Sequence, residues 1–330
     1  MSQKKNRETK TSFLKHFSIL TLLILTALLA ESCKKPGLKE SEGYVDVPGG
    51  KVWYRVVGSG EATPLLLLHV GPGGPCDELL PLEKLADERP IIFYDQLGGG
   101  KADRPDDPSL WRIERFVEEV AKVRKALGLK EVHLYGHSWG TMLATDYMLT
   151  GPTGIKSLIL ASPCLSAKRW VEDADKLIAE LPMETQETIK KHEEAGTTDS
   201  KKYQKAVFEY IKRHVCRLDP WPPELKEAAA NTGIAVYHSM WGPSEFCPTG
   251  NLKNYDNTAR LREISIPTLL IVGEYDEATP EAAAWYKSLM PNASLVVIEN
   301  GSHLAMWEET DAYIKALRKF LNSVEQQEKG

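Results

Sequence analysis

The chain has 330 residues, of which 42% are hydrophobic and 26% are charged, and its formal net charge is −5. These fractions are close to globular averages, so disorder is not expected, and the length allows one large domain with an insertion, or two domains. The sequence has no basic stripe and no cluster of lysine or arginine interleaved with aromatic residues, which argues against nucleic acid as a partner.

The start of the chain has the pattern of a secretory leader. A lysine-rich beginning precedes the apolar run 19–30, which is too short to span a bilayer comfortably. Cys33 follows this run closely, at a place that resembles the lipid-attachment site of a bacterial lipoprotein. We expect 1–33 to be a leader with a lipid on Cys33 and 34–43 to be a polar tether. The protein would then be exported to a bacterial cell envelope and held at a membrane, facing the periplasm or the surface. The alternative is an uncleaved N-terminal anchor.

From residue 44 onward the sequence indicates a sheet. Two strand-like segments, 45–47 and 52–57, flank a Pro-Gly-Gly-Lys turn and predict a hairpin. Short apolar runs follow, which are typical of parallel strands covered on both faces. These runs are 65–69, 91–94, 132–135, 158–161, 268–272 and 295–298.

Helical patterns alternate with these strands. They cover 113–127, 141–149, 280–290 and 310–324. Alternating strands and helices predict a doubly wound α/β fold with a mostly parallel sheet.

One long stretch, 166–263, interrupts this alternation and has almost no strand pattern. Because it lies between two buried strands, we expect a helical cap inserted over the strand ends, between the core segments 44–165 and 264–330. The amphipathic helices expected in the cap are 170–181, 183–195, 201–214 and 223–232.

The sharpest chemical feature is the G-x-S-x-G sequence at 136–140. It follows the strand 132–135 and opens the helix 141–149, which is the setting of a nucleophile elbow. The glycines leave room for a tight turn that exposes the Ser138 hydroxyl. We expect Ser138 to be the nucleophile of a hydrolase; the alternative is a structural glycine-rich turn that contains a serine.

A serine hydroxyl needs a base to become a nucleophile. His303 lies in the loop after the strand 295–298, and Asp276 lies in the loop after the strand 268–272. The order Ser, Asp, His, with each residue just past a strand, is that of the α/β-hydrolase fold. The sequence therefore predicts a triad of Ser138, His303 and Asp276. Rival candidates are, for the base, His137, His214 and His238 and, for the acid, Glu274 and Glu277.

A glycine-rich loop, 69–74, follows the strand 65–69. Acyl transfer needs two backbone N–H groups aimed at the developing oxyanion. One is expected from Trp139, the residue after the nucleophile, and the other from this loop. The alternative is a simple flexible turn.

With these features in place, the chain resembles the proline iminopeptidase family, which are serine aminopeptidases that remove an N-terminal residue. The resemblance runs from about Gly49 to the C-terminus and includes the cap. The core blocks identify only the superfamily, whereas two cap blocks point to this family. The core blocks are 69–73, 94–100, 136–140, 273–280 and 301–303, and the cap blocks are 217–222 and 241–246.

The resemblance implies that Gly71 and Trp139 form the oxyanion hole, and that Glu245 and Glu277 hold the α-ammonium group of the substrate. Carboxylates in a partly desolvated pocket suit that task. The alternatives are a helix N-terminal charge for Glu277 and a solvated loop acid for Glu245. Trp139 and Trp241 either form an apolar wall for a proline ring or are core packing. The expected partners are short peptides or aminoacyl amides with a free N-terminus, and no metal or organic cofactor is required.

Two departures from the family bear on substrate preference. Val70 stands where the family usually has glycine, and Gly-Gly-Gly-Lys-Ala at 98–102 replaces the usual Gly-Cys-Gly-Arg-Ser. An esterase or amidase with the same triad is the alternative function, although an ester gives Glu245 and Glu277 nothing to pair with. A surface lipoprotein that only binds a ligand would be expected to lose the triad. A dehalogenase or epoxide hydrolase would need aspartate at position 138.

The remaining cysteines are widely scattered and include no C-x-x-C pair, so no zinc site is predicted. An exported protein can form disulfides, but buried free thiols are the favoured interpretation. These residues are Cys76, Cys164, Cys216 and Cys247.

Overall fold

The computed structural model describes residues 38–327, so the expected leader, Cys33 and the first part of the expected tether lie outside the described residues. The elements in chain order are β1 (Ser41–Val47), β2 (Gly50–Val57), β3 (Leu65–Leu68), η1 (Cys76–Leu85), β4 (Ile91–Tyr94), η2 (Pro108–Leu110), α2 (Ile113–Ala126), β5 (Val132–His137), α3 (Trp139–Leu149), β6 (Ile155–Ala161), α4 (Ala167–Ala179), α5 (Met183–Glu194), α6 (Lys201–His214), α7 (Pro223–Ala230), α8 (Ile234–Met240), η3 (Thr258–Glu263), β7 (Thr268–Gly273), α9 (Pro280–Ser288), β8 (Ala293–Ile298), α10 (Ala305–Glu308) and α11 (Thr310–Gln327).

Within the described residues, the strands form one sheet in the order β1-β2-β4-β3-β5-β6-β7-β8. The β1–β2 hairpin is antiparallel, and β2 is antiparallel to β4. All later pairings are parallel. The prediction of a doubly wound, mostly parallel sheet is therefore confirmed.

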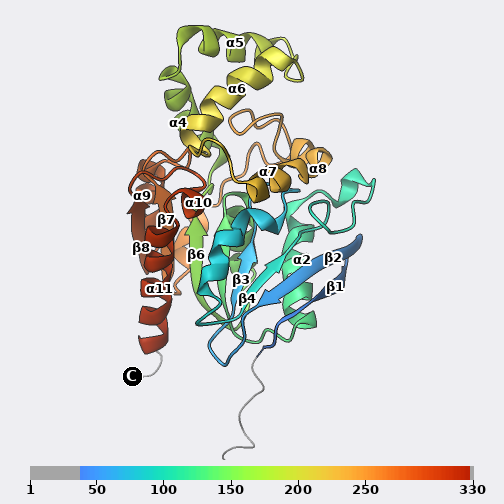
Figure 1. Cartoon of the computed structure of the whole chain (residues 1–330), viewed down its shortest axis with the longest axis vertical. Helices are drawn as coiled ribbons and strands as arrows, with labels where there is room; N and C mark the ends of the chain where they lie inside the picture. The colour runs from blue at the N-terminus through green and yellow to red at the C-terminus, as the bar shows by residue number, and fades with distance from the viewer. Residues whose placement is uncertain (1–37, 328–330) are drawn as a thin grey trace, which may run out of the picture. The chain divides into compact units, whose positions relative to one another are not determined.

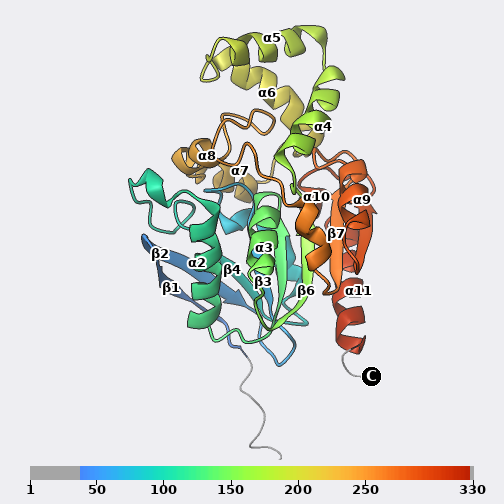
Figure 2. The ribbon, with the colours of Figure 1, turned by 180° about the vertical axis from the view of Figure 1, so that it is seen from behind.

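The central strands are apolar because helices cover both faces of the sheet. Every residue of β3, β4, β5 and β7 is buried. Figure 1 shows η1 and α11 on one face, and Figure 2 shows α2 and α3 on the other. The helix α2 buries Phe116, Val120 and Val123, a spacing that places them on one side of the helix.

The structure differs from the sequence-based expectation at several element boundaries. β1 begins at Ser41, inside the segment expected to be the tether. α3 begins at Trp139, directly after the nucleophile, and β6 begins at Ile155. The 3₁₀ helix η1 was not predicted, because it contains Pro81 and buries leucines three residues apart, a spacing that fits a 3₁₀ turn rather than an α-helix.

The helices α4 to α8 lie between β6 and β7 in the chain and stand over the carboxyl ends of the strands (Figure 1). Part of the cap has a small core of its own, which includes Tyr203, Tyr210 and Phe246. The end of α6 is attached to the loop after β8: the N–H of His303 donates to the His214 carbonyl at 3.0 Å, and that of Leu304 donates to the Val215 carbonyl at 2.9 Å. The cap and the loop after β8, which carries His303, are therefore joined by main-chain hydrogen bonds.

Between residues 38 and 327, no helix is long and apolar enough to cross a membrane.

Candidate active site

Ser138 sits in the turn between β5 and α3 with φ 53° and ψ −117°, a conformation that is strained for a residue with a side chain. Its N–H donates to the Ala161 carbonyl at 2.9 Å. A Cβ on Gly136 would lie 2.2 Å from the carbonyl oxygen of Gly140, and a Cβ on Gly140 would lie 2.2 Å from that of Leu68. Both glycines are needed because backbone atoms occupy the space of a side chain, which holds the nucleophile elbow in shape.

The predicted base and acid are brought together. His303 Nδ1 donates to Asp276 Oδ1 at 2.8 Å, and both side chains are buried. The Asp276 carboxylate also accepts from the N–H of Ala278 at 2.8 Å and from the Ser162 hydroxyl at 2.6 Å. Asp276 thus has a fixed orientation and holds the His303 ring with Nε2 free to act.

The rival histidines contact the backbone rather than reacting atoms. His137 Nε2 donates to the His303 carbonyl at 2.9 Å, and burial lowers the pKa of the His137 ring. His214 Nδ1 donates to the Tyr275 carbonyl at 3.1 Å. His238 lies on α8 in the cap. His303 is the histidine paired with a carboxylate in the triad position.

Ser138 and His303 do not form a hydrogen bond with each other in the structure of residues 38–327. His303 Nε2 has no hydrogen-bond partner among these residues, and its nearest ion-pair partner is Glu277 Oε1 at 3.8 Å. Catalytic hydrogen bonds are often long before substrate binds, so His303 stays the predicted base.

The two expected oxyanion donors are available. Gly71 has φ 53°, and Trp139 is the first residue of α3. Neither backbone N–H donates to an acceptor within the described part of the chain. A helix N-terminus favours negative charge, so the Trp139 amide is suited to an oxyanion.

A buried histidine holds the loop that carries Gly71. His69 Nδ1 donates to the Val70 carbonyl at 2.9 Å, while His69 Nε2 accepts from the N–H of Gln96 at 3.0 Å. The Gln96 side chain accepts in turn from the Trp139 indole at 2.8 Å. Gln96 therefore links the loop that carries Gly71 to the side chain of Trp139. Burial lowers the pKa of His69, which keeps this ring neutral.

Three polar residues that organise the site were given no role from the sequence: Asp95 and Gln96, which lie in the block 94–100, and Ser162. Asp95 accepts from the N–H of Cys76 at 2.7 Å and from that of Lys101 at 2.8 Å, and so holds the glycine-rich segment after β4. Asp95 and Gln96 are the first two residues after β4, and Ser162 is the first residue after β6. That position is where ligands bind in open α/β sheets, and it is the signal that could have identified them.

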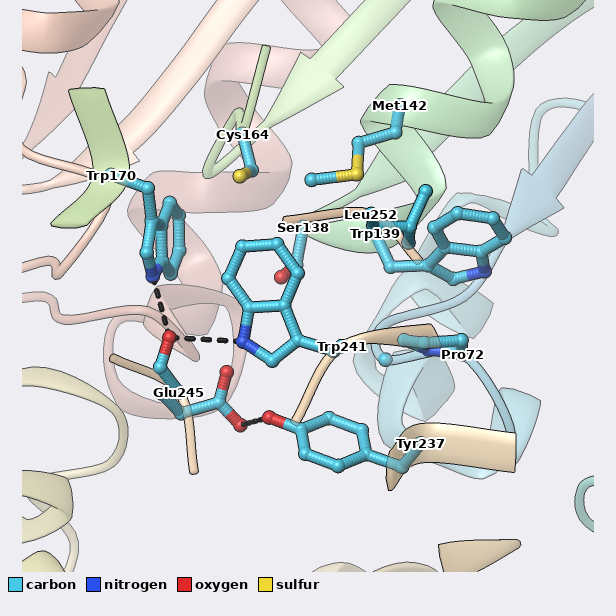
Figure 3. A pocket seen from close by; sticks show the side chains of 11 residues that line it. Pro72, Ser138, Trp139, Met142, Cys164, Trp170, Tyr237, Trp241, Glu245 and Leu252 are labelled. Carbon is cyan, nitrogen blue, oxygen red and sulfur yellow. Dashed lines mark hydrogen bonds between the residues drawn. The ribbon is translucent and has the colours of Figure 1, made fainter. Parts of the chain in front are cut away.

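A pocket lies beside Ser138 (Figure 3). Its lining is mostly apolar and comprises Gly71, Pro72, Ser138, Trp139, Met142, Cys164, Trp170, Tyr237, Trp241, Glu245 and Leu252. Trp139 and Trp241 are therefore walls of the pocket, and Trp139 also packs edge-on against Phe116 at a centroid distance of 5.5 Å. Trp139 is therefore both a wall of the pocket and part of the core packing.

Glu245 reaches this pocket from the cap. Its backbone carbonyl accepts from the Trp170 indole at 2.8 Å and from the Trp241 indole at 3.0 Å, and its carboxyl accepts from the Tyr237 hydroxyl at 2.7 Å (Figure 3). Burial raises the pKa of the Glu245 carboxyl. The residue is held in place at the pocket and is not a solvated loop acid.

Glu277 is 1% exposed, and neither of its carboxyl oxygens accepts a hydrogen bond of good geometry among residues 38–327, although the Tyr210 hydroxyl faces the carboxyl and lowers its pKa against the effect of burial. Burial raises the pKa of Glu277 well above its ordinary value, and the charges of Glu245 and Asp276 raise it further. The capping residue of α9 is Thr279, whose side chain accepts from Ala282. A buried carboxyl without a partner costs free energy, so its presence beside the triad indicates a function.

The four cysteines of the described residues are unpaired. Cys76, Cys164 and Cys216 are buried as expected, whereas Cys247 is only half-buried. Residues 38–327 contain no group of three or more side chains arranged to hold a metal ion.

Comparisons with known proteins agree with this geometry. A family model described as the alpha/beta hydrolase fold matches residues 63–310. The chain is 48% identical over 286 residues to the proline iminopeptidase of Heyndrickxia coagulans, which covers 86% of this chain and 99% of that protein. It is 39% identical over 290 residues to the proline iminopeptidase of Clostridium botulinum, covering 86% and 99%. The crystal structure of the Mycobacterium smegmatis proline iminopeptidase superposes with a TM-score of 0.80 at 33% identity, covering 87% of this chain and 99% of that one.

Proposed function

The chain belongs to the proline iminopeptidase family of α/β hydrolases, and from this membership and the site we infer that it is a serine aminopeptidase that releases N-terminal proline from peptides. The observation that carries the inference is the placement of two carboxyls, the half-buried Glu245 at the pocket and the buried Glu277 beside the Asp276–His303 pair. The triad supplies acyl transfer, and the carboxyls supply the selection of a free amine.

In the proposed reaction, Ser138 Oγ attacks the carbonyl carbon of the first residue while His303 Nε2 takes the hydroxyl proton. The N–H groups of Gly71 and Trp139 stabilise the oxyanion. His303 then gives its proton to the leaving amine, and the shortened peptide departs. Water, activated by the same histidine, releases proline from Ser138.

The proposed role of Glu245 and Glu277 is to bind the α-ammonium group. Neither carboxyl has a lysine or arginine partner in the ion pairs of residues 38–327, although burial of a carboxylate is costly without one. A substrate ammonium supplies the missing positive charge. The apolar walls formed by Trp139 and Trp241 suit the ring of proline.

The alternative of an esterase with the same triad is less well supported, because a neutral ester leaves both carboxyls without a counter-charge. An assay separates the two functions. The purified protein is given prolyl, alanyl, leucyl and phenylalanyl chromogenic amides, an N-acetylated prolyl amide and a short-chain ester, with Ser138→Ala as the inactive control. We expect the prolyl amide to be cleaved best and the acetylated amide to be refused. Equal cleavage of the acetylated amide would contradict the peptidase assignment.

We also propose that the protein is exported and anchored by a lipid on Cys33 in a bacterial cell envelope. The support is the sequence alone: a basic start, the apolar run 19–30 and the cysteine that follows it. Expression of the full chain in a bacterium with labelled palmitate tests the proposal. Label should be incorporated by the natural chain and lost in Cys33→Ser, and absence of label from the natural chain would rule out lipidation.

A further inference from the structure

The general base faces a second carboxyl besides that of Asp276. His303 Nε2 lies 3.8 Å from Glu277 Oε1, and the side-chain exposures of the two residues are 2% and 0%. Burial leaves little room for water between them, and two charges at this distance interact strongly in such surroundings.

The contact involves the one nitrogen that catalysis needs. His303 Nδ1 is used by Asp276 at 2.8 Å, so only Nε2 can take the proton of Ser138. Within residues 38–327, neither Nε2 nor the carboxyl oxygens of Glu277 have a hydrogen bond of good geometry, and the donor that faces the carboxyl from α6 is the Tyr210 hydroxyl. Burying a polar group without a hydrogen bond costs free energy. A hydrogen bond between His303 Nε2 and the Glu277 carboxyl is therefore favoured.

The surroundings of Glu277 strengthen this pairing. The titratable groups that face it are Asp276 on its own loop, Glu245 from the cap, Tyr210 on α6 and Cys164 after β6. None of these four is cationic. Among the described residues, His303 is therefore the basic group with which Glu277 pairs.

We propose that in the free protein a proton is shared between Glu277 Oε1 and His303 Nε2, so that Glu277 withholds the general base from Ser138 until a substrate ammonium displaces it. The inference rests on the proposed function, because it assigns Glu277 as the amine-binding carboxylate. A movement of about 1 Å converts the present separation into a hydrogen bond.

The exchange on substrate binding is balanced in protons. The ammonium group brings its own N–H donors to the Glu277 carboxylate, and the shared proton leaves to water. The lone pair of Nε2 is then free to accept the Ser138 proton. Specificity for a free N-terminus thus has two sources: an uncharged substrate is bound weakly, and it also meets a base that is not released.

Hydrolysis of p-nitrophenyl acetate tests the proposal without the use of a peptide. Glu277→Leu removes the carboxyl and keeps an apolar side chain of similar size. We expect kcat/KM for this neutral ester to rise at least about fivefold, because the fraction of protein with a free base increases. Glu274→Leu is the matched control, because it removes an exposed carboxyl on the same loop that accepts from the N–H of Asn300. No rise in Glu277→Leu, or an equal rise in Glu274→Leu, overturns the proposal.

A second measurement uses the unmodified protein and does not depend on the folding of a variant. Propylamine, which is protonated at neutral pH, is added to the ester assay. Because its ammonium group can occupy Glu277 without supplying an acyl group, we expect it to raise kcat/KM for p-nitrophenyl acetate. Inhibition alone, or no change, contradicts the proposal. Turnover of the prolyl amide is measured in parallel, and failure there would reject the proposed function whatever the ester results.

Discussion

The Ser162 hydroxyl donates to Asp276 Oδ2 at 2.6 Å, and this bond joins the end of β6 to the acid of the triad. Ser162 has φ 47°, in the left-handed region that is unfavourable for a residue with a side chain. Its N–H donates to the Ile271 carbonyl at 2.8 Å, which ties the strained residue to β7. Strain retained next to a reacting group indicates a positioning residue.

Replacement of this serine should therefore affect turnover rather than binding. Ser162→Ala removes a hydrogen bond to a charged group, worth about 1.5–3 kcal/mol. We expect kcat for the prolyl amide to fall by about tenfold or more, since each 1.36 kcal/mol on the barrier is tenfold in rate. KM should hardly change, because Ser162 is not among the residues that line the pocket. Steady-state kinetics of Ser162→Ala and the natural protein measure the effects on kcat and KM separately.

Ser162→Gly is the matched control, because glycine also lacks the hydroxyl but accepts the left-handed conformation without strain. Its kcat should fall as much as that of Ser162→Ala. Its melting temperature should be higher than that of Ser162→Ala. If Ser162→Gly retains full kcat, the alanine effect comes from backbone strain and the positioning role is wrong.

Tyr237→Phe tests the amine site through its pH dependence. The Tyr237 hydroxyl donates to Glu245 and lowers the pKa of that carboxyl against the effect of burial. Without it, the Glu245 pKa rises, and the carboxylate needed for the ammonium is protonated at a higher pH. The acid limb of kcat/KM for the prolyl amide should therefore move to higher pH. Tyr44→Phe, at a position that is 57% exposed, should leave the limb in place. A limb that stays fixed or moves to lower pH in Tyr237→Phe would contradict the assigned role of Glu245.

Glu78, whose carboxyl is close enough to Glu245 to feel its charge, makes the free energy of unfolding depend on pH. Burial, and then the charges of Glu245 and Asp77, raise the pKa of Glu78 from 4.5 to about 8. Since the folded form keeps a proton that the unfolded chain loses, stability falls as pH rises from about 4.5 through about 8. Glu78→Gln should be more stable than the natural protein at pH 9, by about 1 kcal/mol or more, and the difference should disappear near pH 4.

Urea unfolding at the two pH values measures the free energies for Glu78→Gln. Glu42→Gln, on an exposed residue of β1, is the control and should show no difference at either pH. A Glu78→Gln variant that is equally stable at pH 9 would show that the carboxyl is better solvated than its position indicates.

The sheet and the Asp276–His303 pair could be predicted from the sequence because each leaves a local pattern. A strand covered on both faces must be apolar throughout, as the four leucines of β3 are. In a parallel sheet the carboxyl ends of the strands lie at one edge, so residues that follow different strands are brought together. The order of Ser138, Asp276 and His303, each just past a strand, predicted the pairing of Asp276 with His303.

Other parts of the site could not be predicted, because they depend on contacts between distant main-chain segments. The His214 carbonyl accepts the N–H of His303 at 3.0 Å and that of Glu277 at 3.3 Å, and thus orients the base and the buried carboxyl together. A carbonyl is common to every residue, so no sequence pattern marks it. The approach of Glu277 to Nε2 likewise follows from how α6, β7 and the loop after β8 pack.

Gly140→Ala tests the packing on which the elbow depends. A Cβ at this position would lie 2.2 Å from the Leu68 carbonyl oxygen, which belongs to β3 and cannot move aside without breaking the sheet. We expect a loss of about 3 kcal/mol or more in the free energy of unfolding, at the upper end for overpacking, together with loss of prolyl amide turnover. Gly151→Ala is the comparison, since a Cβ there meets nothing within 4 Å and only its φ of 73° is unfavourable. That variant should lose about 1–2 kcal/mol and keep its activity. Urea unfolding of both variants gives the two values. If Gly140→Ala unfolds at the same urea concentration as Gly151→Ala and remains active, α3 does not pack on β3 as closely as described, and the geometry of Ser138 must have another cause.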